Sequence, residues 1–154
     1  MNVRRVGIGV IRHGRSRVVA AAAVAVAAAC AVLVAACGSE AHDLFLVTRS
    51  GDVPGAQLSL RITDDGRASC NHKPLVEISS DELIAARDVE RNLEDPSKAQ
   101  LRLAPGPQSI LSYRVRTEQG GVAWSDDSAR QPAVLFKLAK LTRDVAKGPC
   151  HLAR

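Results

Sequence analysis

Two cysteine–histidine pairs are the residues with the most recognisable chemistry in this chain. Cys70 lies two residues before His72, and Cys150 directly precedes His151. Two cysteines brought together can form a disulfide, whereas two thiolates and two imidazoles can bind zinc. Neighbouring ligands such as Cys150 and His151 rarely point at one metal ion, which argues against zinc. The redox compartment decides between the two chemistries.

A third cysteine, Cys37, ends an N-terminal segment that has the pattern of an export signal. Five arginines and no acidic residue precede Cys37, and residues 18–36 are almost entirely alanine and valine. A basic start, an apolar run and small residues before a cleavage site are typical of a secretory signal peptide. The residues directly before the cysteine are Leu33, Val34, Ala35 and Ala36.

These closing residues resemble the lipobox of bacterial lipoproteins. The resemblance implies cleavage before Cys37, acylation of its sulfur with fatty acids such as palmitate, and attachment to the cell membrane outside the cytoplasm. It divides the chain into a signal peptide at 1–36, a lipidated tether at 37–42 and a single extracytoplasmic domain at 43–154.

Two alternatives for the N-terminal segment remain open. An uncleaved transmembrane anchor needs about 20 apolar residues, and residues 18–36 are near that minimum but poor in leucine and isoleucine. Arg4 and Arg5 also suggest twin-arginine export, although the residues after the pair fit that signal poorly.

The charge of the whole chain is misleading once this segment is set aside. The chain has 21 basic residues and 16 acidic ones, but five of the arginines and none of the acids precede Cys37. The remainder therefore has 16 of each and is formally neutral. Nucleic-acid binding loses its electrostatic basis, and we expect no nucleic-acid partner.

Cys30 lies within the predicted signal peptide, so Cys70 and Cys150 are the only pair in the predicted domain, and outside the cytoplasm they are expected to be oxidised. The sequence therefore predicts a Cys70–Cys150 disulfide, with His72 and His151 exposed beside it. Such a bond closes a loop of about 80 residues and stabilises the fold by roughly 4 kcal/mol through loop entropy.

No motif in the sequence indicates a particular enzymatic reaction. Phosphate-binding loops, nucleophile elbows and zinc-protease helices are missing from the sequence. The carboxylate pairs Asp64-Asp65 and Asp126-Asp127 fit turns better than a calcium site or acid–base catalysis. We therefore expect no catalytic residue, cofactor or metal. Three arginines expected on outward strand faces could form a small basic patch or belong to an ordinary solvated face: Arg61, Arg114 and Arg116.

Hydrophobic periodicity predicts an α+β fold with the element order β-β-β-α-β-β-β-α. Alternating apolar residues indicate strands, and a 3.6-residue apolar spacing indicates two helices covering one face of an antiparallel sheet of five or six strands. The predicted strands are 43–48, 56–63, 67–72, 100–103, 109–117 and 122–125. The predicted helices are 79–94, ending at Asp95-Pro96, and 132–147, ending at Gly148.

The stretch from Phe45 to Gly66 resembles the start of emfourin-type proteins, small inhibitors of thermolysin-like metalloproteases. This sequence has Asp52-Val53-Pro54 where a glycine and an apolar residue are expected, and the cysteine pair is not part of that pattern. The resemblance implies that one loop contacts a protease. That loop consists of Arg49, Ser50, Gly51, Asp52, Val53, Pro54 and Gly55.

The sequence therefore favours a lipid-anchored extracytoplasmic binding module, with protease inhibition as its most specific version and an extracellular protein as its partner. A cell-envelope enzyme and a passive structural lipoprotein are the alternatives.

Overall fold

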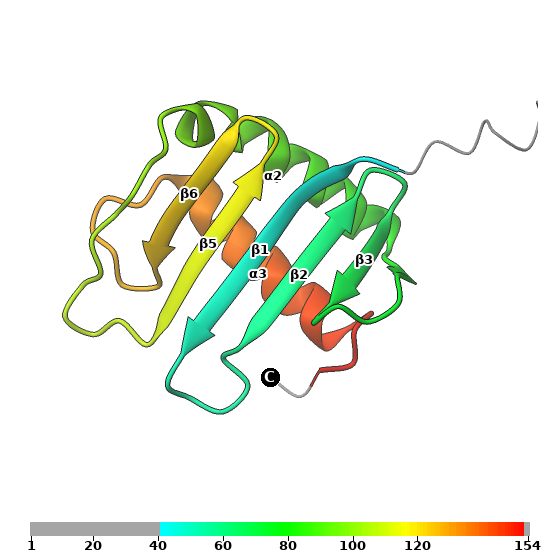
Figure 1. Cartoon of the computed structure of the whole chain (residues 1–154), viewed down its shortest axis with the longest axis horizontal. Coiled ribbons are helices and arrows are strands. Elements are labelled where there is room, and N and C mark those ends of the chain that lie inside the picture. The colour runs from blue at the N-terminus through cyan, green and yellow to red at the C-terminus, as the bar shows by residue number, and fades with distance from the viewer. Residues whose placement is uncertain (1–40, 153–154) are drawn as a thin grey trace, which may run out of the picture. The chain divides into compact units, whose positions relative to one another are not determined.

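Residues 41–152 are described by a computed structural model, and the signal segment and Cys37 lie outside the described residues. The described part contains one sheet and two helices (Figure 1). The elements in chain order are β1 (Asp43–Gly51), β2 (Leu58–Thr63), β3 (Arg67–Cys70), β4 (Val76–Glu77), α2 (Ser80–Lys98), β5 (Leu111–Thr117), β6 (Gly120–Ser125) and α3 (Ala133–Lys147).

The six strands form one antiparallel sheet in the order β4-β3-β2-β1-β5-β6. Strand β1 lies inside the sheet, with β2 on one side and β5 on the other. Its alternation places Phe45 and Val47 in the core, whereas Thr48 between Val47 and Arg49 is exposed. The sequence predicted a strand over residues 43–48, and the structure extends it to Gly51 with one face buried.

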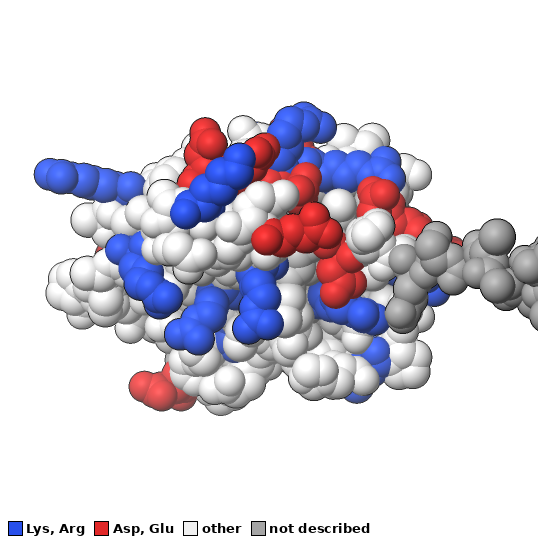
Figure 2. All heavy atoms as spheres, turned by 45° about the horizontal axis from the view of Figure 1, so that its top comes forward, with Lys and Arg blue, Asp and Glu red and all other residues white. Residues whose placement is uncertain are grey.

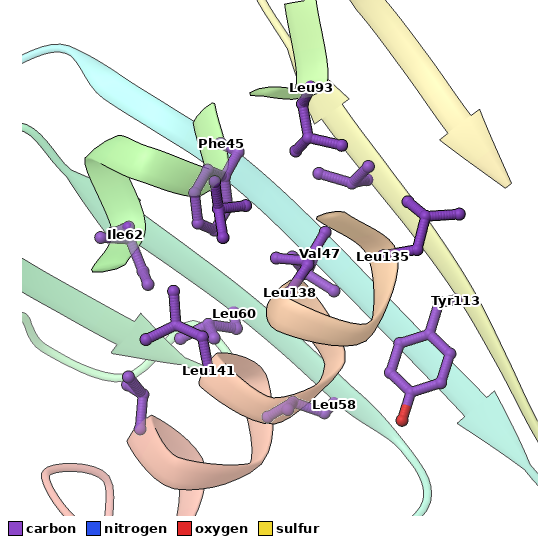
Figure 3. Close-up of a cluster of buried hydrophobic side chains, with 14 of the residues drawn as sticks. Phe45, Val47, Leu58, Leu60, Ile62, Leu93, Tyr113, Leu135, Leu138 and Leu141 are labelled. Carbon is purple, nitrogen blue, oxygen red and sulfur yellow. The ribbon is translucent and has the colours of Figure 1, made fainter. Parts of the chain in front are cut away.

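Helices α2 and α3 both cover the same face of the sheet (Figure 1), which confirms the predicted α+β architecture. The core lies between the two layers, and Figure 3 shows leucines of both helices pointing toward the strands. The largest fully buried side chains are Phe45, Leu60, Ile62, Leu93, Leu135 and Leu138.

Helix α2 begins as predicted and ends later than predicted. The backbone N–H of Glu82 donates to Ser79 Oγ at 3.2 Å, and the N–H of Ser79 donates to Glu82 Oε2 at 2.8 Å. This reciprocal capping box satisfies amides at the helix start. The expected end at Asp95-Pro96 is wrong, because Pro96 lies inside the helix and α2 continues to Lys98. A proline in the last turn removes one helical hydrogen bond without stopping the chain from completing that turn.

Helix α3 ends as expected at Gly148, whose N–H donates to the Asp144 carbonyl at 2.8 Å. At the other end, Pro132 precedes the first helical residue.

Two strand predictions differ from the structure. Residues 100–103 form no strand; Arg102 makes only an isolated parallel bridge with Ala123 on β6. The sheet instead gains β4, which pairs with β3 after the turn at residues 71–75 and contributes two residues only. The observed order is therefore β-β-β-β-α-β-β-α. A two-residue strand is too short to show the alternation of apolar and polar residues by which a sequence predicts a strand.

Candidate functional site

The predicted partner-binding loop is divided between a strand and an exposed turn. Arg49, Ser50 and Gly51 are the last residues of β1, and Arg49 is buried. The next four residues, Asp52–Gly55, are exposed and begin the connection to β2, which Ala56 and Gln57 complete. The exposed part of the predicted loop is therefore Asp52–Gly55, which we call the β1–β2 loop.

Arg49 holds the β1–β2 loop from inside. Its Nε donates to the Ala56 carbonyl at 3.0 Å, and its Nη2 donates to the Gly55 carbonyl at 2.9 Å. The Ala56 N–H closes a turn on the Val53 carbonyl at 3.0 Å. Gly55 has a φ of 76°, a conformation that glycine adopts without strain. The loop is thus braced, and its tip presents Val53 at 44% exposure.

A stacked pair of aromatic side chains lies next to Arg49, which pairs with Tyr113 across β1 and β5. Tyr113 on β5 and Trp124 on β6 have ring centroids 5.0 Å apart and planes 12° apart. Burial raises the pKa of the Tyr113 phenol, while the nearby Arg49 guanidinium opposes that rise. The phenol therefore stays protonated at neutral pH and does not act as a base.

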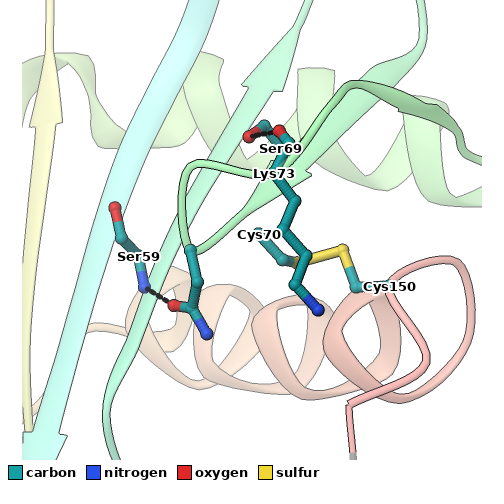
Figure 4. The surroundings of a disulfide bond; sticks show 6 residues. Ser59, Ser69, Cys70, Lys73 and Cys150 are labelled. Carbon is teal, nitrogen blue, oxygen red and sulfur yellow. Dashed lines mark hydrogen bonds between the residues drawn. A yellow bond between two sulfur atoms is a disulfide. The ribbon is translucent and has the colours of Figure 1, made fainter.

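The predicted disulfide between Cys70 and Cys150 is present (Figure 4). It joins β3 to the segment after α3, with Cα atoms 6.1 Å apart. Beside it, Ser69 Oγ donates to the Lys73 carbonyl at 2.6 Å, and the Ser59 N–H donates to Asn71 Oδ1 at 2.9 Å. The end of the chain is therefore fastened to the sheet.

The disulfide removes the zinc alternative, because its sulfurs are bonded to each other and cannot ligate as thiolates. His72 and His151 are exposed, as expected. Within residues 41–152, no group of three or more histidine, cysteine or acidic side chains is arranged to hold a metal ion.

The carboxylate pairs serve turns. Asp64 accepts from Arg87 Nε at 3.0 Å, and Asp65 accepts from Arg67 Nε at 2.6 Å. The backbone N–H groups of Ile110 and Gln108 donate to Asp126 and Asp127, respectively. Each carboxylate thus has a structural partner.

The sheet face opposite the helices carries arginines, as the sequence suggested. Leu46 pairs with Arg61 on β2 and with Arg116 on β5, and Thr48 pairs with Arg114. Paired residues point to the same side of a sheet, so all three arginines lie on the face that the helices leave uncovered. Arg61 approaches Asp43 at 3.6 Å.

Sequence reasoning did not single out Arg102, which joins this group. The N–H of Leu103 donates to the Ala123 carbonyl at 2.9 Å, and the N–H of Ala123 donates to the Leu101 carbonyl at 3.0 Å. These bonds lay residues 101–103 along the outer edge of β6. The alternation of Leu101, Arg102 and Leu103 was the available signal, since it places the arginine opposite its two apolar neighbours.

Two shallow, adjoining hollows on this face contain the basic groups. The larger has a volume of about 530 Å³ and is lined by Gln100, Arg102, Arg114, Arg116 and Ala123, among others. The second, about 480 Å³, extends along Thr48, Ser50 and Ser112. In Figure 2, blue side chains run across the middle of the view, below a band where red and blue are mixed. We call Arg102, Arg114 and Arg116 the arginine face.

Comparisons with protein-family models, with curated proteins and with solved structures return no match for this chain. Between residues 41 and 152, neither helix is long and apolar enough to cross a membrane.

Proposed function

We propose that this protein is a lipid-anchored extracytoplasmic binding module, tethered through Cys37, whose β1–β2 loop engages an extracellular protein. The lipobox-like residues before Cys37 support the anchor. The β1–β2 loop supports binding, because it is exposed at its tip and held at its base by a buried guanidinium.

The observation that carries the extracytoplasmic location is the Cys70–Cys150 disulfide. Stable structural disulfides belong mainly to oxidising compartments, which in bacteria lie outside the cytoplasm. An apolar leader ahead of a disulfide-bonded domain is a combination typical of exported proteins.

Protease inhibition is the most specific version of the proposal. A braced loop binds with a small loss of conformational entropy, which is how a short segment achieves useful affinity. The emfourin-like pattern of the region and the exposed Val53 side chain favour this version. A thermolysin-like metalloprotease is the proposed partner.

The anchor is tested by growing cells that express the full chain with an alkyne-bearing palmitate analogue. The protein is expected to acquire the label and to sediment with membranes, and Cys37→Ser is expected to lose the label. A label retained by Cys37→Ser, or an unlabelled wild type, contradicts lipidation.

The loop is tested by titrating a thermolysin-like metalloprotease with the purified chain. Wild type is expected to inhibit stoichiometrically, and Val53→Asp is expected to weaken inhibition at least tenfold because it removes the apolar tip. Ile84→Asp is the matched control, since Ile84 on α2 is also an exposed apolar residue and lies outside the loop.

The alternatives predict other results. Absence of inhibition by the wild type removes the inhibitor version. Turnover of cell-wall fragments by the purified chain favours a cell-envelope enzyme. A passive structural lipoprotein predicts neither inhibition nor turnover, with an anchor that still labels.

A further inference from the structure

We infer that the arginine face rests on anionic phospholipid headgroups of the membrane that holds the anchor. The inference deepens the proposed function, because it depends on a lipid at Cys37, and it assigns a second surface that lies apart from the β1–β2 loop. The anchor restrains the domain near the bilayer, and the arginine face then determines which side of the domain turns toward it.

The three arginines form one cluster although they come from two segments, β5 and residues 101–103. Arg114 and Arg116 are two positions apart on β5 and so point to the same side. Arg102 faces the same side because it bridges Ala123, which pairs with Arg114. All three line the larger hollow.

None of these three arginines has a carboxylate partner among the described residues. Four other exposed lysines and arginines also lack one, but they are spread over the β3–β4 turn, α2, the segment before α3 and the end of α3: Lys73, Arg91, Arg130 and Lys147. At the same end of the sheet, Asp43 pairs with Arg61 at 3.6 Å, and Glu118 Oε1 lies 3.8 Å from His42 Nδ1.

By contrast, three of the four basic residues of α3 pair with carboxylates: Lys137, Lys140 and Arg143. Lys137 pairs with Asp88 at 2.8 Å, and Lys140 pairs with Asp144 at 2.6 Å. The sheet face of the formally neutral domain therefore carries a cluster of three arginines that have no ion-pair partner among the described residues.

Phosphate-bearing headgroups fit the chemistry of this face. A guanidinium presents several N–H donors in a plane and matches phosphate oxygens with two parallel hydrogen bonds. Hydroxyl groups of Thr48, Ser50 and Ser112 line the adjoining hollow and add donors. The hollows are shallow and open, so they suit a flat array of headgroups better than one enclosed small molecule.

Chain length brings the face within reach of the membrane. Five residues separate Cys37 from Asp43, the first residue of β1. A fully extended segment of this length spans about 20 Å, so the start of the sheet stays close to the bilayer surface. Arg116 pairs with Leu46 near this end of β1. Tethering at this distance gives headgroups a high effective concentration at the arginine face.

A single lipid attachment and a basic protein surface each bind a membrane weakly, and the two together bind it more stably. One lipid attachment and a basic surface jointly hold proteins on anionic membranes, and each arginine near the surface strengthens the attraction. The attraction extends roughly 10 Å at moderate ionic strength, a range that the tether allows.

Trp124 provides an intrinsic probe for this orientation. It is the only tryptophan in the chain and lies on β6, whose Ala123 pairs with Arg114 of the arginine face. The lipidated chain is reconstituted into phosphatidylcholine vesicles with or without phosphatidylglycerol, each containing a dansyl-headgroup lipid. Energy transfer from Trp124 to dansyl is then measured at low and high salt.

We expect transfer to be greater with phosphatidylglycerol and to fall toward the phosphatidylcholine value at high salt. Arg102→Gln/Arg114→Gln/Arg116→Gln is expected to lose most of the gain. The control Lys140→Gln/Arg143→Gln/Lys147→Gln changes the net charge equally on α3 and is expected to keep it. All six residues are exposed, so both variants are expected to fold.

Equal transfer in the two vesicle types overturns the inference, as does equal loss in both triple variants. Flotation with pure phosphatidylcholine vesicles reports the anchor separately. A chain that does not float with these vesicles lacks the lipid. For such a chain, the salt-dependent increase in energy transfer with phosphatidylglycerol still tests the role of the three arginines.

Discussion

Thr142 on α3 is fully buried, and its hydroxyl has no hydrogen-bond partner among the described residues. The same is true of Ser97 on α2. A hydroxyl transferred from water to an apolar interior without a partner costs free energy that its neighbouring contacts must offset. These two side chains are therefore sites where the core can be improved.

Replacing Thr142 with valine is expected to raise the free energy of unfolding by about 1 kcal/mol, because a methyl group takes the place of an unsatisfied hydroxyl of similar size. The midpoint of urea unfolding measures the change. Thr142→Ser keeps the hydroxyl and removes a methyl, so it should lower stability by roughly 1 kcal/mol. A valine variant no more stable than wild type would show that the hydroxyl is satisfied.

Arg49 illustrates what a sequence conceals at this scale. An arginine beside serine and glycine predicts an exposed loop residue, and charged side chains are seldom buried without a partner. Its partners are backbone carbonyls of Gly55 and Ala56, which no residue pattern encodes. The exposed part of the loop, in contrast, was predictable from its Asp-Val-Pro-Gly composition.

At the scale of single elements, the start of α2 depends on Ser79. Ser79→Ala is expected to cost about 1 kcal/mol of unfolding free energy, since the N–H of Glu82 loses its acceptor. Ser80→Ala is the control, because Ser80 is the first helical residue and caps nothing. Thermal unfolding of both variants provides the comparison, and equal melting temperatures would argue against the cap.

The β2–β3 turn gives the fold a dependence on pH. Hydrogen bonds from Arg67 and then from Thr63 hold the pKa of Asp65 below its usual value. A carboxyl with a lowered folded-state pKa stabilises the fold above its unfolded pKa of about 3.9 and loses that effect as the pH falls through the folded value.

Asp65→Asn is therefore expected to be less stable than wild type at neutral pH, with the difference shrinking as the pH falls below about 4. Urea unfolding of both proteins over a pH series measures this. A difference that stays constant with pH would mean that the charge of Asp65 is not the cause.

Elements with a strong periodicity of apolar residues could be predicted from the sequence, whereas elements that depend on tertiary contacts could not. The alternation of β2 and the apolar spacing of α3 identify both correctly, since each buries one face against the other layer. Residues 100–103 alternate like a strand, but they meet β6 through a single bridge. A short alternating run does not reveal how many partners its backbone will find.

At the scale of the whole molecule, the disulfide is the largest single contributor that can be removed cleanly. Cys70→Ala/Cys150→Ala is expected to lower the free energy of unfolding by roughly 4 kcal/mol, because the bond closes a loop across a sequence separation of 80 residues. Urea unfolding measures the loss. Dithiothreitol should reproduce it in wild type and leave the double variant unchanged, and a reductant effect on the variant would point to another cause.

The position of β1 inside the sheet has a consequence for how the chain acquires its structure. Although β1 comes first in the described part, one of its edges stays unpaired until β5 has been synthesised. Arg116 of β5 pairs with Leu46 of β1, which lies some 70 positions earlier in the chain. Contacts between such distant segments slow folding, since a long loop must close before they form. During synthesis or export that starts at the N-terminus, the apolar strand β1 would keep one edge unpaired until residue 117 had appeared. Nascent or truncated chains that end before β5 should therefore self-associate, which makes completion of synthesis or export the step that permits folding.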